Sequence, residues 1–426
     1  MMTRTESIAI SKGGSRYLRH MITMGIFFFI FGFITWINGT LIPYLKIACQ
    51  LQEWEVYAVT FSFYIAYTIM ALPSGKFLSR TGMIGGMRWG LIIMAFGCLF
   101  FIPAALMREY LLFLIALFIV GSGLTLLQTA VNPYITLLGS ETSAAQRISI
   151  MGICNKFAGI LAPIVFGAII LGDANGLLHE LERLNGIELK LRLDNLAHGV
   201  ILPYSIMAGI LLALGLLVPS SRLPEISASF PVKEIGITAY LSNTAFKMRV
   251  AAGFTATFCT VGAEVIAGDT IGNYAIYQGM PLDVAKILTS HTLAFMMIGY
   301  LVGVSFIPRY FSQKKAFIIS NFLGLSILIC ILVLPGKISV HFVSLLGFAN
   351  ALLWPAIWPQ TLRNLQGKQL HIASAILVMG IAGGAVIPLI YGYLAGVFNN
   401  QLAYLILLPL YLYNLKFSAS ERSAPK

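Results

Sequence analysis

Charged residues are scarce in this sequence. Lys, Arg, Asp and Glu make up 10% of its 426 residues, whereas hydrophobic residues make up 58% and the mean hydropathy is +0.85. Soluble domains are typically about 25% charged and about 45–50% apolar. A chain of this length with so little charge cannot hide its apolar surface from water, so the composition predicts that lipid is its solvent.

Cysteine is also scarce, and the short motifs of common enzymes are missing. The five cysteines are scattered and form no CxxC pair, which excludes a disulfide framework or a cysteine metal site and leaves them as small packing residues. HExxH, GxSxG and P-loop motifs are absent, as is any cluster of His and Asp. We therefore expect no cofactor and no metal, and a membrane-embedded enzyme is the least supported alternative.

Long apolar runs are what the sequence has instead. A helix needs about 20 apolar residues to cross a bilayer. Applying this rule gives twelve approximate spans, the last one shorter, and predicts an all-α membrane protein with spans at 22–45, 56–75, 86–106, 110–138, 147–171, 198–218, 250–278, 285–307, 315–334, 339–361, 370–396 and 401–415. The first run is too long for the apolar core of a signal peptide and lacks an A-x-A-like cleavage site, so we expect an uncleaved first span.

The basic residues are distributed unevenly between the loops. With the N-terminus in the cytoplasm, 20 of the 28 Lys and Arg lie in cytoplasmic segments, seven lie on the other side, and Lys156 lies within a span. This asymmetry predicts cytoplasmic N- and C-termini. It also accounts for the net charge of +12 without a nucleic-acid partner. We expect a multi-pass protein of the cytoplasmic (inner) membrane.

The two halves of the chain share a weak internal repeat. Pro163 in span 5 is matched at an offset of 225 by Pro388 in span 11, and Pro133 in span 4 is matched at an offset of 226 by Pro359 in span 10. Two parallel repeats are similar to the plan of the major facilitator superfamily, whose substrates bind near the midplane between the halves. We expect a six-helix bundle at 1–218, a cytoplasmic linker at 219–249, and a second six-helix bundle with the tail at 250–426.

Three ionisable residues fall well inside predicted spans. Glu264 and Asp269 lie in span 7 and Lys156 in span 5. Each costs about 2.5–3.5 kcal/mol at the centre of a membrane helix, so such residues face a partner or a water-filled cavity. Two interpretations stay open: an ion pair between Lys156 and Glu264 that locks two helices, and a site that couples transport to a cation.

The two acids of span 7 are five residues apart, which places them roughly 140° apart around a regular helix. They can point the same way only if the helix breaks, and Gly262, Gly268 and Gly272 favour a break. We expect Glu264 to face the central cavity and Asp269 to lie nearer the outer mouth.

Amide and aromatic side chains also recur inside the spans. Amides offer both donors and acceptors, and tryptophan faces stack on the C–H faces of sugars. Such residues suit a neutral polyhydroxylated ligand, although hydrogen bonding between helices and simple packing would explain them as well. The candidate substrate-binding residues are Trp36, Asn38, Tyr64, Gln128, Asn132, Asn155, Trp354 and Trp358, with Tyr67 a weaker candidate beside Tyr64.

Four stretches of sequence resemble one transporter family. They are Phe28–Lys46 (FFIFGFITWINGTLIPYLK), Gly121–Gly139 (GSGLTLLQTAVNPYITLLG), Arg147–Pro163 (RISIMGICNKFAGILAP) and the LVMGIAGGAVIP segment of span 11. The sequence resembles the fucose:proton symporter family of the major facilitator superfamily, in its glucose/galactose transporter branch. The resemblance implies cation-coupled uptake of a hexose. The expected partners are a small sugar, a coupling cation and the lipid bilayer, with the chain acting as a monomer.

The sequence departs from this family at the positions of its coupling acids. The resemblance implies an acid in span 1 and another in span 4, and Gly39 and Gln128 occupy those positions, whereas the family's Asn in span 5 is kept as Asn155. If transport is coupled, the coupling must have moved, and Glu264, Asp269 and Lys156 are the candidates. The departure favours glucose or galactose over fucose and leaves proton, sodium and uncoupled transport open.

The charge distribution generates a first prediction. A reporter protein that works only in the cytoplasm should be active when fused after Lys426, because the tail is predicted on the side rich in Lys and Arg. A reporter that works only outside the cytoplasm should be inactive at the same position. The check is a paired assay with one reporter active in the cytoplasm and one active outside. A tail reporter found outside would contradict the proposed orientation.

Overall fold

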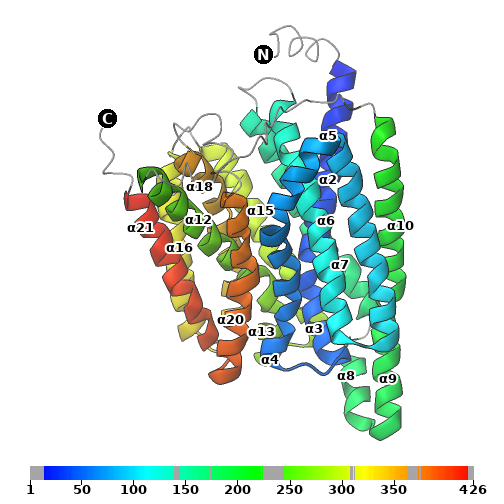
Figure 1. Ribbon diagram of the computed structural model, residues 1–426. Coiled ribbons are helices and arrows are strands. Elements are labelled where there is room, and N and C mark those ends of the chain that lie inside the picture. Colours follow the sequence, from blue (N-terminus) through cyan, green and yellow to red (C-terminus); the bar gives the residue numbers. More distant parts are fainter. Residues whose placement is uncertain are drawn as a thin grey trace.

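The described part of the chain is helical throughout. The structure is a computed structural model, and it describes residues 14–138, 144–171, 174–221, 223, 244–307, 310, 312–362, 373 and 376–420. Most of these residues lie in helices that run side by side, and no strand occurs among them (Figure 1). The all-α prediction is confirmed for the described residues.

The N-terminal half contains long helices connected by short ones. The first helix of the sequence is interrupted at Ile37, which separates the long α2 from the shorter α3. The elements of this half are α2 (Gly14–Trp36), α3 (Asn38–Ala48), α4 (Glu53–Val56), α5 (Ala58–Met107), α6 (Tyr110–Leu137), α7 (Ala144–Ile170), α8 (Ala174–Arg183), α9 (Gly186–His198) and α10 (Ile201–Leu217).

The C-terminal half has a similar make-up, with one long helix interrupted by a π-helical turn. The elements are α12 (Thr244–Val265), the π-turn η4 (Ile266–Thr270), α13 (Ile271–Tyr277), α14 (Leu282–Ala285), α15 (Leu288–Phe306), α16 (Gln313–Val333), α17 (Lys337–Asn350), α18 (Leu353–Leu362), η5 (Gly380–Ala382), α20 (Gly383–Val397), η6 (Leu402–Ile406) and α21 (Leu407–Ser420). Most of the linker predicted at 219–249 lies outside the described residues.

The helices match the apolar runs of the sequence. Eleven helical segments of the described chain are long and apolar enough to cross a membrane, and a shorter apolar helix covers Leu402–Ser418. These twelve segments correspond to the twelve predicted spans. The mixed-charge segment after span 5 forms α8 and α9, which project beyond the other helices at one end of the molecule (Figure 1).

The boundary between spans 2 and 3 differs from the prediction. The sequence suggested two helices separated by a loop, whereas α5 is helical on both sides of Gly82 and changes direction there. Gly82 has φ +71° and ψ 177°, a conformation open almost only to glycine because it has no Cβ. The turn is therefore made within a single residue.

The first described helix begins, and the last described helix ends, at the same end of the molecule (Figure 1). We call the opposite end the distal face. It is formed by the loops at 49–57, 108–109, 171–200, 278–287, 334–337 and 398–402. An arrangement with both termini at one end agrees with an even number of crossings.

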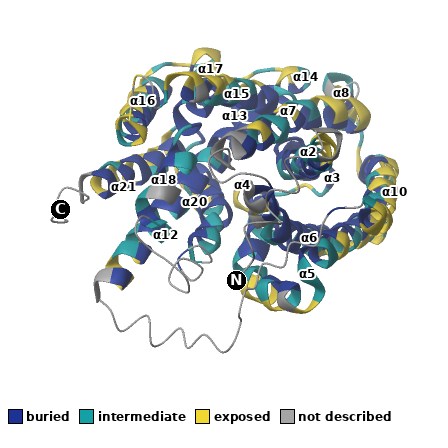
Figure 2. Cartoon of the chain, turned by 90° about the horizontal axis from the view of Figure 1, so that it is seen from above, coloured by how far each residue is buried: buried dark blue, intermediate teal, exposed yellow. Residues whose placement is uncertain are grey.

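The two halves are connected by hydrogen bonds at the distal face. Lys46 Nζ donates to Asn273 Oδ1 at 3.1 Å, Lys286 Nζ donates to the Leu171 carbonyl at 2.6 Å, and the Leu282 amide donates to Asn175 Oδ1 at 3.0 Å. Seen along the helices, α13, α14 and α15 of the C-terminal half lie next to α2, α7 and α8 (Figure 2). The halves are therefore joined at the distal face.

The backbone of Gly82 generates a stability prediction. Gly82→Ala should lower the unfolding free energy by about 1–3 kcal/mol, because the Cβ strains the required φ and ψ. Gly75→Ala is the matched control, since Gly75 lies in the same helix and an added Cβ there has no neighbour within 4 Å. Thermal unfolding in detergent measures both variants, and equal melting temperatures would contradict the argument.

Candidate functional site

An ion pair joins the two halves of the protein. Lys156 comes from α7 and Glu264 from α12, and Lys156 Nζ lies 2.7 Å from Glu264 Oε1. Their side chains are 9% and 14% exposed, so water screens the pair only weakly. The two charges come from opposite halves of the protein. Each neutralises the other, because either one alone would be an unpaired charge in a nearly buried position.

Trp36 lies beside this ion pair. The Lys156 ammonium is 4.9 Å from the centroid of the Trp36 ring, within the range of a cation–π interaction. The ring fits between two glycines: an added Cβ would lie 2.6 Å from Trp36 Cδ1 at Gly159 and 2.3 Å from Trp36 Cζ3 at Gly268. Glycine at both positions is therefore what allows α2, α7 and η4 to meet around one tryptophan ring. Tyr300 of α15 lies on another side of the ammonium, at 6.0 Å.

Asp269 lies in the π-turn that interrupts span 7. The sequence predicted a break between Glu264 and Asp269, and η4 provides it at Ile266–Thr270. The Asp269 side chain is fully buried, and its Oδ2 accepts a hydrogen bond of 3.2 Å from Thr60 Oγ1 of α5. Since span 7 runs toward the distal face, Asp269 lies nearer that face than Glu264.

Gln128 belongs to a second group of polar residues that also reaches both halves. Its Nε2 donates to the Tyr67 hydroxyl at 2.9 Å, and the Tyr67 ring stacks on Tyr64 with 6.1 Å between centroids. Tyr64 in turn packs against α20, where an added Cβ at Gly384 would lie 3.1 Å from Tyr64 Cδ1. The row Gln128, Tyr67 and Tyr64 therefore extends from α6 through α5 to the C-terminal half.

Asn155 and Asn132 lie on neighbouring helices of the N-terminal half. Asn155 Nδ2 donates to the Phe28 carbonyl at 3.3 Å, and its own carbonyl oxygen would be 1.9 Å from a Cβ added at Gly32. Asn155 is thus held against α2, one residue before Lys156. Asn132 lies one helical turn beyond Gln128 on α6 and is exposed.

The remaining candidates are Asn38, Trp354 and Trp358. Asn38 is fully buried within the N-terminal half, where it lines a cavity of about 10 Å³ together with Phe101 and Tyr204. Trp354 lies near the start of α18, half-buried against the apolar core. The side chain of Trp358 lies outside the described residues.

Thr60 and Tyr300 are the contacts that sequence reasoning missed. Neither has a signal in the sequence, because a threonine and a tyrosine are common in membrane helices and only the packing of α5 and α15 brings them to Asp269 and Lys156.

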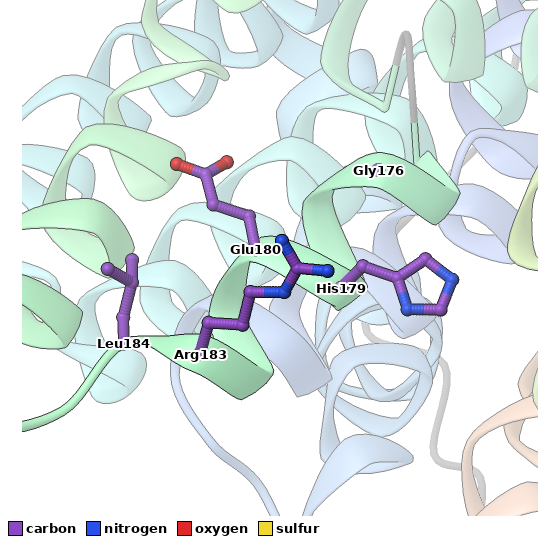
Figure 3. Close-up of a pocket in the computed structure, with 5 residues that line it drawn as sticks. All are labelled: Gly176, His179, Glu180, Arg183 and Leu184. Atoms are coloured by element: carbon purple, nitrogen blue, oxygen red, sulfur yellow. The ribbon is translucent and has the colours of Figure 1, made fainter.

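A cavity at α8 is unrelated to this cluster. It has a volume of about 480 Å³ and lies on α8, lined by Gly176, His179, Glu180, Arg183 and Leu184 (Figure 3). Glu180 is already paired with Arg192 of α9 at 2.9 Å, and His179 is 77% exposed. Among the described residues no group of three His, Cys, Asp or Glu is placed to hold a metal. We interpret α8 and α9 as a solvated cap.

Comparison with known proteins relates this architecture to transporters. Residues 24–387 match the family model described as Major Facilitator Superfamily. The chain is 31% identical over 398 residues to a glucose/galactose transporter of Brucella abortus biovar 1 (strain 9-941), covering 92% of both chains. It is 26% identical over 403 residues to the L-fucose-proton symporter of Escherichia coli (strain K12), covering 92% of this chain and 91% of the relative.

Solved structures give the same result for the fold. The crystal structure of FucP, a major facilitator superfamily transporter in the outward conformation, superposes with a TM-score of 0.74 at 25% identity, covering 96% of this chain and 100% of that one. A bacterial homolog of the human lysosomal transporter Spinster, inward-facing and unoccupied, has a TM-score of 0.68 at 13% identity, covering 97% and 100%. The chain therefore belongs to the Major Facilitator Superfamily and is a multi-pass membrane transporter rather than an enzyme.

Proposed function

We propose that the protein takes up a hexose of the glucose/galactose type by cation-coupled alternating access, with the proton favoured over sodium as the coupling ion. The proposal takes its substrate class from relatives named glucose/galactose transporter and its ion from those named L-fucose-proton symporter. The similarity to FucP, a transporter solved in the outward conformation, supports an architecture in which access can alternate.

The ion pair between Lys156 and Glu264 is the observation that carries the proposal. It crosses the interface between the halves, and those halves must separate and rejoin if access alternates. A proton or a sodium ion that binds Glu264 competes with Lys156, and a sugar hydroxyl can accept or donate at either group. Binding at this pair can therefore change how strongly the halves hold together.

The neighbouring side chains suit a neutral ligand rich in hydroxyl groups. Trp36 offers an aromatic surface beside the pair, while Gln128, Asn132 and Asn155 offer amide donors and acceptors. A charged substrate would meet one positive and one negative group that already neutralise each other. Stacking plus bidentate hydrogen bonding is the recognition that a hexose needs.

An uncoupled facilitator or exchanger is the second candidate. It is favoured by the two neutral residues, Gly39 and Gln128, at the positions where the resemblance implies coupling acids. The two candidates differ in one property, since a facilitator equilibrates the sugar and only a coupled carrier concentrates it. We further propose an inner-membrane protein that acts as a monomer with both termini in the cytoplasm.

Glu264→Gln should abolish uphill accumulation of hexose while sparing exchange, because the amide keeps the shape and hydrogen bonding of the acid but cannot bind a proton. Uptake and counterflow of radiolabelled hexose in proteoliposomes measure the two activities separately. The matched control is Asp194→Asn, which breaks the 2.9 Å pair with Arg108 inside the N-terminal half and should leave both activities intact. Unchanged accumulation in the Glu264 variant would rule out its coupling role.

Separately imposed ion gradients test the coupling ion. A proton gradient, acidic outside, should drive accumulation of radiolabelled glucose or galactose, and a sodium gradient at constant pH should not. Accumulation with sodium alone would identify a sodium symporter. Equilibration at the same rate under all conditions would identify a facilitator.

A further inference from the structure

Asp269 has the most enclosed carboxyl group of the described chain. It is fully buried in η4, where Oδ2 accepts the hydrogen bond from Thr60 and Oδ1 has no hydrogen-bond partner among the described residues. Thr60 belongs to the N-terminal half and Asp269 to the C-terminal half. The only polar contact found for this carboxyl group therefore crosses the interface between the halves.

Among the described residues, no positively charged side chain is found in hydrogen-bond contact with Asp269. Tyr64 of α5 lies within electrostatic range of both Asp269 and Glu264 and is an uncharged phenol. The elements packed against η4 are α3, α12, α13, α15, α17 and α20. Glu264 is paired with Lys156, and Tyr300 lies at the Lys156 ammonium. The groups that make hydrogen bonds elsewhere are Tyr44, Lys46, Arg249, Tyr274, Tyr391 and, in η6, Tyr404, which bonds to Thr270. Cys259 is a buried thiol, and the exposed groups are Lys247, Tyr277, His291, Lys337, His341 and Tyr393.

A dry carboxylate with one hydrogen bond is an unfavourable group. Burying an isolated charge costs several kcal/mol or more, whereas a neutral carboxylic acid leaves at most one carbonyl oxygen unpaired. A bound metal cation would satisfy the charge but would need about six or more oxygen ligands. One threonine hydroxyl does not supply them, so the proton is the cation that this site suits.

The backbone of η4 moves with the C-terminal half. Thr289 Oγ1 donates to the Gly268 carbonyl at 2.7 Å, and Thr292 Oγ1 donates to the Ala267 carbonyl at 3.1 Å, both from α15. On the other side of Asp269, the Thr270 hydroxyl lies 2.8 Å from the Tyr404 hydroxyl of η6, so Asp269 is fixed to its own half on both sides. Separation of the halves at the distal face must break the hydrogen bond to Thr60 and admit water to Asp269.

We propose that Asp269 is a proton-binding latch of the distal face, which closes when the carboxyl group is protonated and opens when it is ionised. In the open state the carboxylate takes one proton from the water at the distal face and becomes a neutral acid that can be buried against Thr60. If the proton is to drive sugar uptake, it must leave at the end of the molecule opposite the distal face before the distal face reopens. The part of this inference that concerns transport rests on the proposed proton coupling.

The latch is tested by a distance measurement that needs no sugar. In a variant without the five native cysteines, spin labels at Ile187→Cys and Val333→Cys report the opening of the distal face, because both positions are exposed there and lie in different halves. Between about pH 5 and about pH 9, a range wide enough to titrate a buried carboxyl group, the long-distance population should grow with pH. Asp269→Asn should keep the short distance at every pH, since the amide is neutral and nearly isosteric.

Two further variants keep the test specific. Thr60→Val removes the hydrogen bond and should raise the open population at each pH without abolishing the pH response. Asp194→Asn should leave the response as in the parent, because its pair with Arg108 lies inside the N-terminal half. The proposal is overturned if the parent distances do not change with pH, if Asp269→Asn responds like the parent, or if sodium at constant pH closes the face. Absence of hexose uptake would refute the proposed function and leave this measurement valid.

Discussion

Lipid offers no hydrogen bonds, so every polar group at mid-membrane depth must find its partner inside the protein. This constraint determines the interface between the two halves. Lys156, Glu264 and Asp269 each make a polar contact with the opposite half, at 2.7 Å for the ion pair and 3.2 Å for Asp269 with Thr60. The halves are therefore joined in the apolar interior by polar groups that find their partners across the interface. The surrounding apolar surface is free to face lipid.

Close approach of the helices is the condition for these contacts, and glycine provides it. The two glycines at 159 and 384, which are 225 residues apart, have equivalent neighbours. An added Cβ at Gly159 would lie 2.6 Å from Trp36 of α2 and 2.9 Å from Leu293 of α15, and one at Gly384 would lie 3.0 Å from Val265 of α12 and 3.1 Å from Tyr64 of α5. Each glycine thus packs against the first helix of its own half and one helix of the other half.

The sequence predicts the fold well because hydropathy and length decide it. Twelve apolar runs correspond to eleven helices long enough to cross a membrane and one shorter helix, and the cost of a charge in lipid singled out Lys156, Glu264 and Asp269. The sequence could not say which way a side chain faces around its helix. Asn38 follows Trp36 by two residues, yet the two side chains lie in different surroundings. Trp36 lies beside Lys156, whereas Asn38 lines a small cavity with Tyr204 inside the N-terminal half. The reason is that the helix is interrupted at Ile37, between α2 and α3. The partner of Asp269 was hidden for the same reason, since it depends on the packing of α5 against η4.

The contacts that join the halves differ in how easily water can replace them. At the distal face, the half-buried lysines Lys46 and Lys286 donate to Asn273 and to the Leu171 carbonyl, whose residues are buried. Each contributes about 0.5–3 kcal/mol net, because water offers equivalent hydrogen bonds once the halves separate. The bond between Thr60 and Asp269 lies deeper, where water enters only after the outer bonds have broken. An opening that proceeds from the distal face inward therefore meets weak exchangeable bonds first and reaches the buried carboxyl group last. The protonation state of that group then decides whether the opened arrangement persists, because a neutral acid can return to a dry environment and a carboxylate cannot.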